Sequence, residues 1–120
     1  FTTTWSLDLH FPDTENSKYF PGQEFYSWCT QTNIFPYHVP YRCLYSRNIE
    51  NLFMAGRNIS VTHVAFGTIR LQRTCGMMGE VVGMAASICR KYDCMPRTVY
   101  LKYLSEFKEL MEKGVPAKSI

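Results

Sequence analysis

A helix with one face made of small residues is the feature that most limits how this chain can fold. The pattern over Gln72–Lys91 is helical, and Gly76, Gly79, Gly83 and Ala86 recur there at spacings of three, four and three. Glycine inside a helix costs roughly 1 kcal/mol relative to alanine, so three on one stripe require a packing reason. We expect another backbone or a flat ligand to lie against this stripe, and the other apolar residues to bury the helix nearly all round.

Two segments precede this helix, and they differ sharply in polarity. Asn51–Ala55 is a short, largely apolar run closed by Gly56, a pattern that predicts a buried strand ending where backbone passes close to another group. Arg57–Thr68 consists largely of small and polar residues, which is typical of a loop folded around a polar ligand. The stretch therefore predicts a strand, a polar loop and a long helix in that order.

The first third of the chain indicates strands and loops. Alternation over Thr2–His10 predicts a half-buried strand, and the turn-forming residues of Phe11–Gln23 predict a loop. Glu24–Thr30 fits either a short strand or a helical turn. Two prolines within Ile34–Tyr45 exclude a central strand or a regular helix, so this aromatic segment is expected to be extended.

The end of the chain predicts a turn and a second helix. Tyr92–Met95 is the turn, and Pro96 suits the first turn of an amphipathic helix that runs to Lys113 and stops at Gly114. The expected fold class is α+β, with an N-terminal strand, extended loops, one buried strand, the small-residue helix and this C-terminal helix.

Composition excludes several kinds of protein. A chain of 120 residues that is 46% hydrophobic can form one modest core and is not a disordered chain. The net charge of +3 is spread without a Lys/Arg cluster, so nucleic acid is not an expected partner. The run Thr74–Ile88 is uncharged except for Glu80, and it is short of the ~20 apolar residues of a membrane span. No membrane partner is therefore expected either.

The cysteines and histidines point to neither a disulfide framework nor a metal site. The five cysteines are an odd number without a CxxC pair, which favours free thiols. With no signal peptide visible, they also favour a cytoplasmic location. His10, His38 and His63 stand far apart in the sequence, so no metal is expected.

Several short motifs between Pro40 and Ser87 occur together in a characteristic order. They are PYR, NLFMAGR, THVAFGTIR and GMMGEVVGMAAS. This run resembles the C-terminal FAD-binding segment of the FAD-dependent oxidoreductase family, which is related to the glutathione-reductase-type flavoproteins. In that family the segment closes over the isoalloxazine end of the flavin. The flanking sequences resemble the same family more loosely.

One family feature is absent from these 120 residues. A dinucleotide-binding fold needs a G-x-G-x-x-G turn to seat the pyrophosphate, and the sequence contains no G-x-G. The chain also begins at Phe1, as if within a strand. We therefore expect a fragment of a larger FAD-binding α/β flavoprotein. Residues 1–50 would be a substrate-side strand and aromatic loop segment, and residues 51–120 the C-terminal part of the FAD-binding domain.

The resemblance implies a set of cofactor-binding residues on the expected strand end, loop and helix. They are Gly56, Arg57, Ser60, Gly67, Arg70, Gln72, Gly76 and Gly79. Many relatives have an acid directly after the strand's glycine, to bind the ribityl chain. Arg57 stands there in this chain, which favours contact with flavin or phosphate instead. Arg70, like Arg73, could alternatively be a helix-start arginine paired on the surface.

Two further side chains are candidates for catalysis. Arg42 could clamp a carboxylate or a flavin carbonyl, because a guanidinium offers five donors in a planar fork, or it could pair with an acid of the fold. His63 is the histidine of the signature loop and could exchange a proton with substrate, or it could have a structural role. Asp8 and His10 lie on the polar face of the first strand, and we interpret them as a surface pair.

The expected function is thus that of a C-terminal portion of an FAD-dependent oxidoreductase. FAD and a small-molecule substrate are the expected partners in the intact protein, with hydride or two-electron transfer between them. The chain by itself is expected to bind FAD weakly and to self-associate through apolar surface. The alternative is a small non-catalytic binding or assembly module whose glycine face receives a partner helix.

Overall fold

An antiparallel hairpin forms one end of the molecule. The computed structural model describes residues 1–3, 5–12 and 27–115. Strand β1 (Leu7–Pro12) pairs with β2 (Ser27–Thr32), with Leu7 opposite Thr32 and Pro12 opposite Ser27. Most of the predicted loop Phe11–Gln23 lies outside the described residues, although Phe11 and Pro12 belong to β1. The segment predicted as a short strand or a turn contributes to β2.

The predicted first strand is only partly correct, because the chain bends before β1. Thr2 forms an isolated bridge with His38, and Thr3 donates its backbone N–H to the carbonyl of Tyr37 at 2.9 Å. The first residues therefore run beside the aromatic segment and not along the hairpin. That segment is extended to Pro40, as predicted, and then forms the 3₁₀ turn η1 (Tyr41–Leu44).

The prediction of a buried strand at Asn51–Ala55 is wrong. The run forms a single bridge, between Tyr45 and Phe53, and both Leu52 and Ala55 are exposed. An apolar run becomes a buried strand only when neighbouring strands pair with it and cover it. Among the described residues this run pairs only with the end of η1 and the segment that follows it, so no sheet forms around it.

The expected polar loop is also partly wrong, because its second half is helical. Helix α2 (His63–Ile69) begins after Thr62, whose Oγ1 accepts a hydrogen bond from the backbone N–H of Ala65 at 3.3 Å. Such a cap satisfies one of the unpaired amides of a helix start, so it favours helix in a segment of polar composition. Gly67 and Thr68 are buried on this helix.

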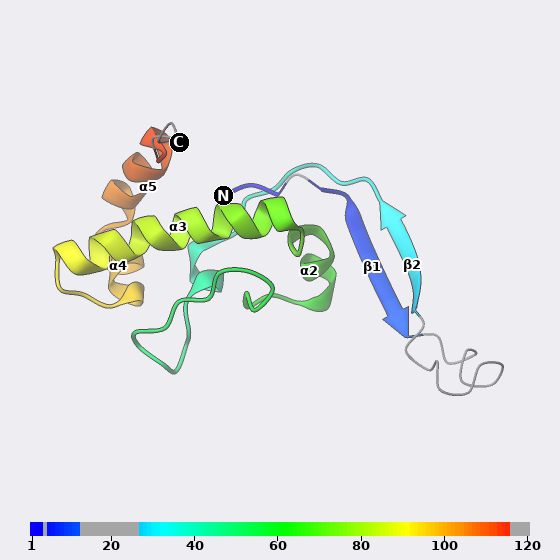
Figure 1. The fold of residues 1–120 in the computed structure, drawn as a ribbon, viewed down its shortest axis with the longest axis horizontal. Helices are drawn as coiled ribbons and strands as arrows, with labels where there is room; N and C mark the ends of the chain where they lie inside the picture. The colour runs from blue at the N-terminus through cyan, green and yellow to red at the C-terminus, as the bar shows by residue number, and fades with distance from the viewer. Residues whose placement is uncertain (4, 13–26, 116–120) are drawn as a thin grey trace, which may run out of the picture.

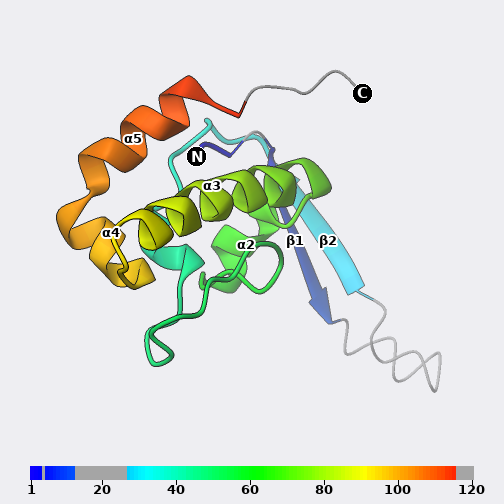
Figure 2. The same cartoon turned by 60° about the vertical axis from the view of Figure 1, so that its left-hand side comes forward.

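The long helix α3 (Gln72–Lys91) has the predicted bounds and lies across the middle of the molecule. Figures 1 and 2 show the hairpin and α2 near its N-terminus and the last two helices near its C-terminus. The residues on its buried face recur every three or four positions and are Thr74, Met78, Val81, Met84, Ala85 and Ile88. This periodicity accounts for one packed face.

The opposite face of α3 is open, so the expectation of burial nearly all round is not met. Gly76, Gly79, Gly83 and Ala86 are all exposed. A Cβ atom added to any of the three glycines would have no described atom within 4 Å. The small-residue stripe is therefore an uncovered surface of this chain. Among the described residues, no helix has the length and apolarity needed to cross a bilayer.

The predicted final helix is divided into two. Helices α4 (Pro96–Lys102) and α5 (Leu104–Lys113) are separated at Tyr103, which has φ −122° and ψ 20°. The Tyr103 ring stacks on that of Tyr92 with 4.1 Å between centroids and 5° between planes. No glycine or proline marks this break, so it reflects tertiary packing. Gly114 ends α5 with φ 66°, as expected of a helix stop.

A single core joins η1 to the three later helices. Leu44, Met78, Val99 and Phe107 are almost entirely buried, and the Tyr41 ring lies 4.9 Å from that of Phe107. The Tyr41 hydroxyl donates to the carbonyl of Pro96 at 2.9 Å. The core thus fixes α3 against η1 and α4. The described architecture is α+β, with one two-stranded sheet and four α-helices.

Candidate functional site

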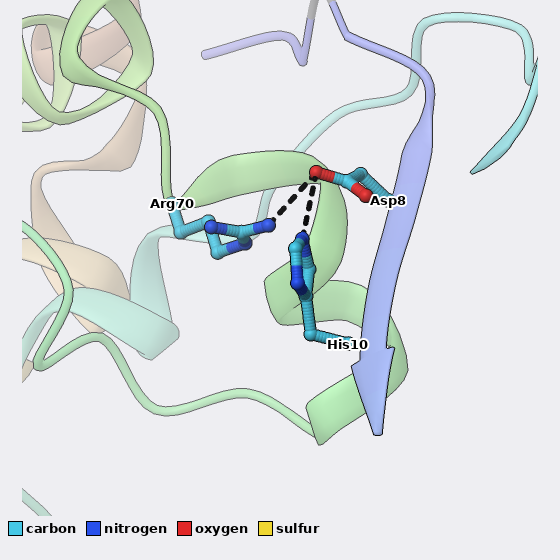
Figure 3. A network of polar contacts seen from close by, with 3 residues as sticks. All are labelled: Asp8, His10 and Arg70. Carbon is cyan, nitrogen blue, oxygen red and sulfur yellow. Dashed lines mark hydrogen bonds and ion pairs between the residues drawn. The ribbon is translucent and has the colours of Figure 1, made fainter. Parts of the chain in front are cut away.

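Arg70 stands at the junction where the hairpin, α2 and α3 meet. It is the C-terminal cap of α2, and its backbone N–H donates to the carbonyl of Phe66 at 3.2 Å. Its guanidinium Nη2 donates to the Asp8 carboxylate of β1 at 2.8 Å. Figure 3 shows the Arg70 and His10 side chains converging on this carboxylate, with His10 Nε2 at 3.3 Å. The interpretation of Asp8 and His10 as a pair is confirmed, and Arg70 is a third member.

Gly67 explains how a residue of α2 can bring β1 so close. A Cβ atom on Gly67 would lie 2.6 Å from the carbonyl oxygen of Asp8 and 2.9 Å from a methyl group of Leu9. Such distances are too short for any side chain, so only glycine allows this approach. Gly67 therefore holds β1 against α2 by its lack of a side chain, and this contact brings Asp8 within reach of Arg70.

A groove of about 500 Å³ opens at the start of α3. Its lining residues are Gly56, Arg57, Arg70, Gln72 and Cys75, and we call it the helix-start groove. Arg57 is exposed and forms no ion pair among the described residues. The groove brings together four of the residues predicted to bind cofactor.

The N-terminus of α3 lies at this groove, which Gln72 of its first turn lines. The capping position, Leu71, makes no side-chain hydrogen bond to the helix, so the amides of the first turn have no capping partner there. The helix dipole places partial positive charge at the same end. Together with the guanidinium groups of Arg57 and Arg70, these amides make the groove a donor-rich, electropositive surface.

A smaller hollow of about 230 Å³ lies on the other side of Arg70. It is lined by Asp8, His10, His63, Phe66, Gly67 and Arg70, and we call it the histidine hollow. The His63 ring meets the Phe11 ring edge to face, with centroids 5.6 Å apart. The structure thus places His63 beside Arg70, as two predicted site residues, and adds Asp8 and His10 to the same hollow.

The remaining predicted site residues lie elsewhere. Arg42 and Ser60 line a third hollow, together with Arg47 and Arg97, and neither contributes to the helix-start groove. Gly76 and Gly79 lie on the exposed stripe of α3 and line none of these hollows. The predicted residues therefore fall into four places, of which the helix-start groove and the histidine hollow share Arg70.

The cysteine thiols with shifted acidity are poor nucleophiles. Burial raises the pKa of the Cys43 thiol, against the opposing effect of nearby Arg42. Burial, reinforced by Cys94, raises the pKa of Cys89 to about 11. A thiol with a raised pKa stays protonated at neutral pH, so neither group is activated.

The described residues contain no group of three or more His, Cys, Asp or Glu side chains that could hold a metal ion.

Comparison with known proteins assigns the chain to a family. The family model for FAD dependent oxidoreductases matches residues 2–111, which is most of the chain. The chain therefore belongs to the FAD dependent oxidoreductase family. Its members are flavoproteins and oxidoreductases, so FAD is the cofactor that the family implies. No curated protein sequence and no solved structure matches the chain.

Proposed function

We propose that this chain is the C-terminal part of an FAD-dependent oxidoreductase and forms the flavin-facing wall of its cofactor site. The observation that carries the proposal is the helix-start groove, where Arg57 and Arg70 line one space together with Gln72 at the start of α3. Family membership makes FAD the group that this space would hold. The motif order of the resemblance supports the C-terminal position.

The residues of the groove fit the polar edge of a flavin. Arg57, Arg70 and Gln72 supply side-chain donors, and the start of α3 supplies backbone donors and positive potential. FAD, when bound, supplies the hydride or two-electron chemistry. The groove would hold the flavin through these residues, and its positive charge would favour the extra negative charge of a reduced flavin. Arg57 would also contact the ribityl-phosphate part.

The histidine hollow is the proposed substrate side of the same site. Arg70 lines both spaces, so a substrate in the hollow would lie next to a flavin in the groove. His63 can exchange a proton with substrate there, since an imidazole nitrogen can either donate or accept a proton. Asp8 holds the Arg70 guanidinium in place and can orient His10 through the contact between Nε2 and Oδ2.

A FAD-retention experiment tests the groove assignment. Arg57→Ala in the purified intact protein should weaken FAD binding by about tenfold or more, as expected for one charge-assisted contact. The ratio of flavin absorbance to protein after dialysis measures retention. Arg73→Ala is the matched control, because Arg73 is exposed on the first turn of α3 and does not line the groove. Equal retention in both variants would refute the assignment.

The open face of α3 favours a second candidate, a non-catalytic assembly module. Gly76, Gly79 and Gly83 leave a bare stripe on which a partner helix or a second copy of the chain could pack. Self-association of the chain by itself is expected under the oxidoreductase proposal as well, through apolar surface that the rest of the protein would cover. If the intact protein is purified without flavin, and its mass by sedimentation corresponds to a stable oligomer, the module is favoured over the oxidoreductase.

A further inference from the structure

Three arginines from separate segments surround one hollow away from the helix-start groove. The hollow has a volume of about 390 Å³ and is lined by Arg42, Cys43, Tyr45, Ser46, Arg47, Met54, Ser60 and Arg97. We call it the triple-arginine hollow. No acidic residue lines it. An adjoining hollow shares Ser46, Arg47 and Arg97 and has Glu50 in its wall.

The fold fixes the segments that carry these arginines. Arg42 belongs to η1, which is joined to the start of α4 by the hydrogen bond from the buried Tyr41 hydroxyl to the Pro96 carbonyl. Arg97 follows directly in α4, and its Nη2 donates to the backbone carbonyl of Arg47 at 3.0 Å. The three guanidinium groups are therefore presented by one packed unit and not by independent loops.

The opposite wall is attached to the same unit. The backbone N–H of Ser60 donates to the carbonyl of Cys43 at 3.0 Å, and that of Met54 donates to the carbonyl of Leu44 at 2.8 Å. These bonds hold the Ser60 segment beside η1. The Ser60 hydroxyl makes no hydrogen bond among the described residues, so it is available as a donor in the hollow.

The charge of the hollow is not neutralised by the chain. Arg42, Arg47 and Arg97 form no ion pair among the described residues, and Glu50 in the adjoining wall forms none either. Like charges gathered at one place repel one another, and an anion between them removes that cost. Arginine matches oxyanions well, because its planar fork donates two parallel hydrogen bonds to one group.

We propose that the triple-arginine hollow binds the phosphoryl group of a small-molecule ligand. A phosphoryl group carries about −1.5 to −2 charge and three acceptor oxygens, so it can use several guanidinium forks at once. A carboxylate carries one charge and is satisfied by a single fork. This site is separate from the proposed flavin contact, since it shares no lining residue with the helix-start groove.

Calorimetric titration of the purified protein with inorganic phosphate tests the proposal at low ionic strength, where exposed charges are least screened. Wild-type protein should show saturable binding, and Arg47→Gln should weaken it by about tenfold, the effect of one charged hydrogen-bond donor. Replacing the Arg47 side chain keeps the backbone carbonyl that Arg97 contacts. Arg90→Gln is the matched control, because Arg90 is exposed and lines neither of the hollows that Arg47 lines. It should bind phosphate as the wild type does.

A second arm distinguishes phosphoryl from carboxylate ligands. Succinate, a dicarboxylate, should bind at least about tenfold more weakly than phosphate, because it lacks a three-oxygen group. The proposal is overturned by absence of saturable phosphate binding, by tighter binding of succinate, or by equal weakening in Arg47→Gln and Arg90→Gln. Flavin content is measured in every sample. Arg47→Gln in the intact protein should bind phosphate about tenfold more weakly while keeping its flavin. Joint loss of both would overturn the proposal, because it would assign the hollow to the cofactor.

Discussion

Asp8 and Arg70 lie 62 residues apart in the chain, and a 2.8 Å ion pair joins them. Both side chains are largely shielded, with 15% and 30% of their surface exposed. The pair connects the hairpin to the junction between α2 and α3, and Arg70 lines both the helix-start groove and the histidine hollow. A change in the charge of this pair therefore alters the electrostatic potential in both spaces.

The first prediction concerns the flavin potential in the proposed site. Arg70→Ala removes a cation from the groove, so it should lower the two-electron midpoint potential of bound FAD. A loss of 1–3 kcal/mol, typical of a charge-assisted contact, corresponds to about 20–60 mV. Spectroelectrochemical titration measures the shift. A cation near the flavin stabilises the reduced form, which carries more negative charge, and this sets the direction.

Substitution of the partner supplies a sharper control. Asp8→Asn removes the anion that offsets Arg70 and keeps the shape of the side chain, so the potential should rise and not fall. Opposite shifts in the two variants are expected only if the pair lies within electrostatic range of the flavin. Shifts in the same direction, or none in either variant, would show that Arg70 is a structural residue.

The second prediction concerns Gly67. Gly67→Ala places a methyl carbon 2.6 Å from the carbonyl oxygen of Asp8. This distance is too short for a contact, so the backbone of β1 or α2 must move. We expect a loss of stability of about 1–3 kcal/mol, the usual effect of overpacking, measured by urea denaturation. Gly76→Ala is the matched control, since open space surrounds that position, and it should stabilise the helix by up to about 1 kcal/mol. Equal effects in the two variants would contradict the close contact.

The parts of the fold that could be predicted are those specified by local pattern. The bounds of α3 follow from its helical periodicity, and the Gly114 stop follows from the conformation that glycine allows. The break at Tyr103 and the missing strand at Asn51–Ala55 could not be predicted, because each depends on contacts made or lacking in space. Thr62 is a residue type that favours a helix start, so α2 could have been predicted from it. The polar composition of the segment favoured a loop instead.

The candidate site shows the same division. Arg57 and Arg70 were placed together because one follows an apolar run and the other precedes a helix, and the structure puts both in one groove. The joining of Asp8 and His10 to Arg70 required the docking of the hairpin on Gly67, which no local pattern reveals. Arg42, the candidate clamp for a carboxylate or a flavin carbonyl, lies on η1, and the hollow that it lines shares no residue with the helix-start groove.

The third prediction uses the raised pKa of Cys89. With a pKa of about 11, only about 0.1% of this thiol is thiolate at pH 8, so its reaction with iodoacetamide should be slow. The rate should increase with pH towards pH 11, because burial favours the protonated form. Cys29 is exposed on β2 and should react faster at pH 8. Mass spectrometry of the labelled peptides measures both rates, and a Cys89 rate at pH 8 equal to that of Cys29 would contradict the shift.

The fourth prediction concerns the buried Tyr41 hydroxyl. Tyr41→Phe keeps the ring contact with Phe107 and removes the donor to the Pro96 carbonyl, which is left without this partner. We expect a loss of about 1–2 kcal/mol of unfolding free energy, as for other buried hydrogen bonds. Tyr100→Phe, on an exposed side chain of α4, is the control and should change stability little. The measurement is the midpoint of denaturant unfolding, compared between variants whose unfolding free energies have the same dependence on denaturant concentration.

The last prediction tests what covers the open stripe of α3. Gly79 has no described atom near a prospective Cβ, so Gly79→Leu should leave the helix content of this chain intact by circular dichroism. If the stripe packs against the cofactor site or another part of the intact protein, the same leucine overpacks that contact, and flavin retention should fall severalfold. Glu109→Leu adds an apolar side chain at an exposed position on another helix, α5, and should retain flavin. Full flavin retention in Gly79→Leu would show that the stripe faces solvent in the working protein, and the glycines would then require an explanation other than close packing.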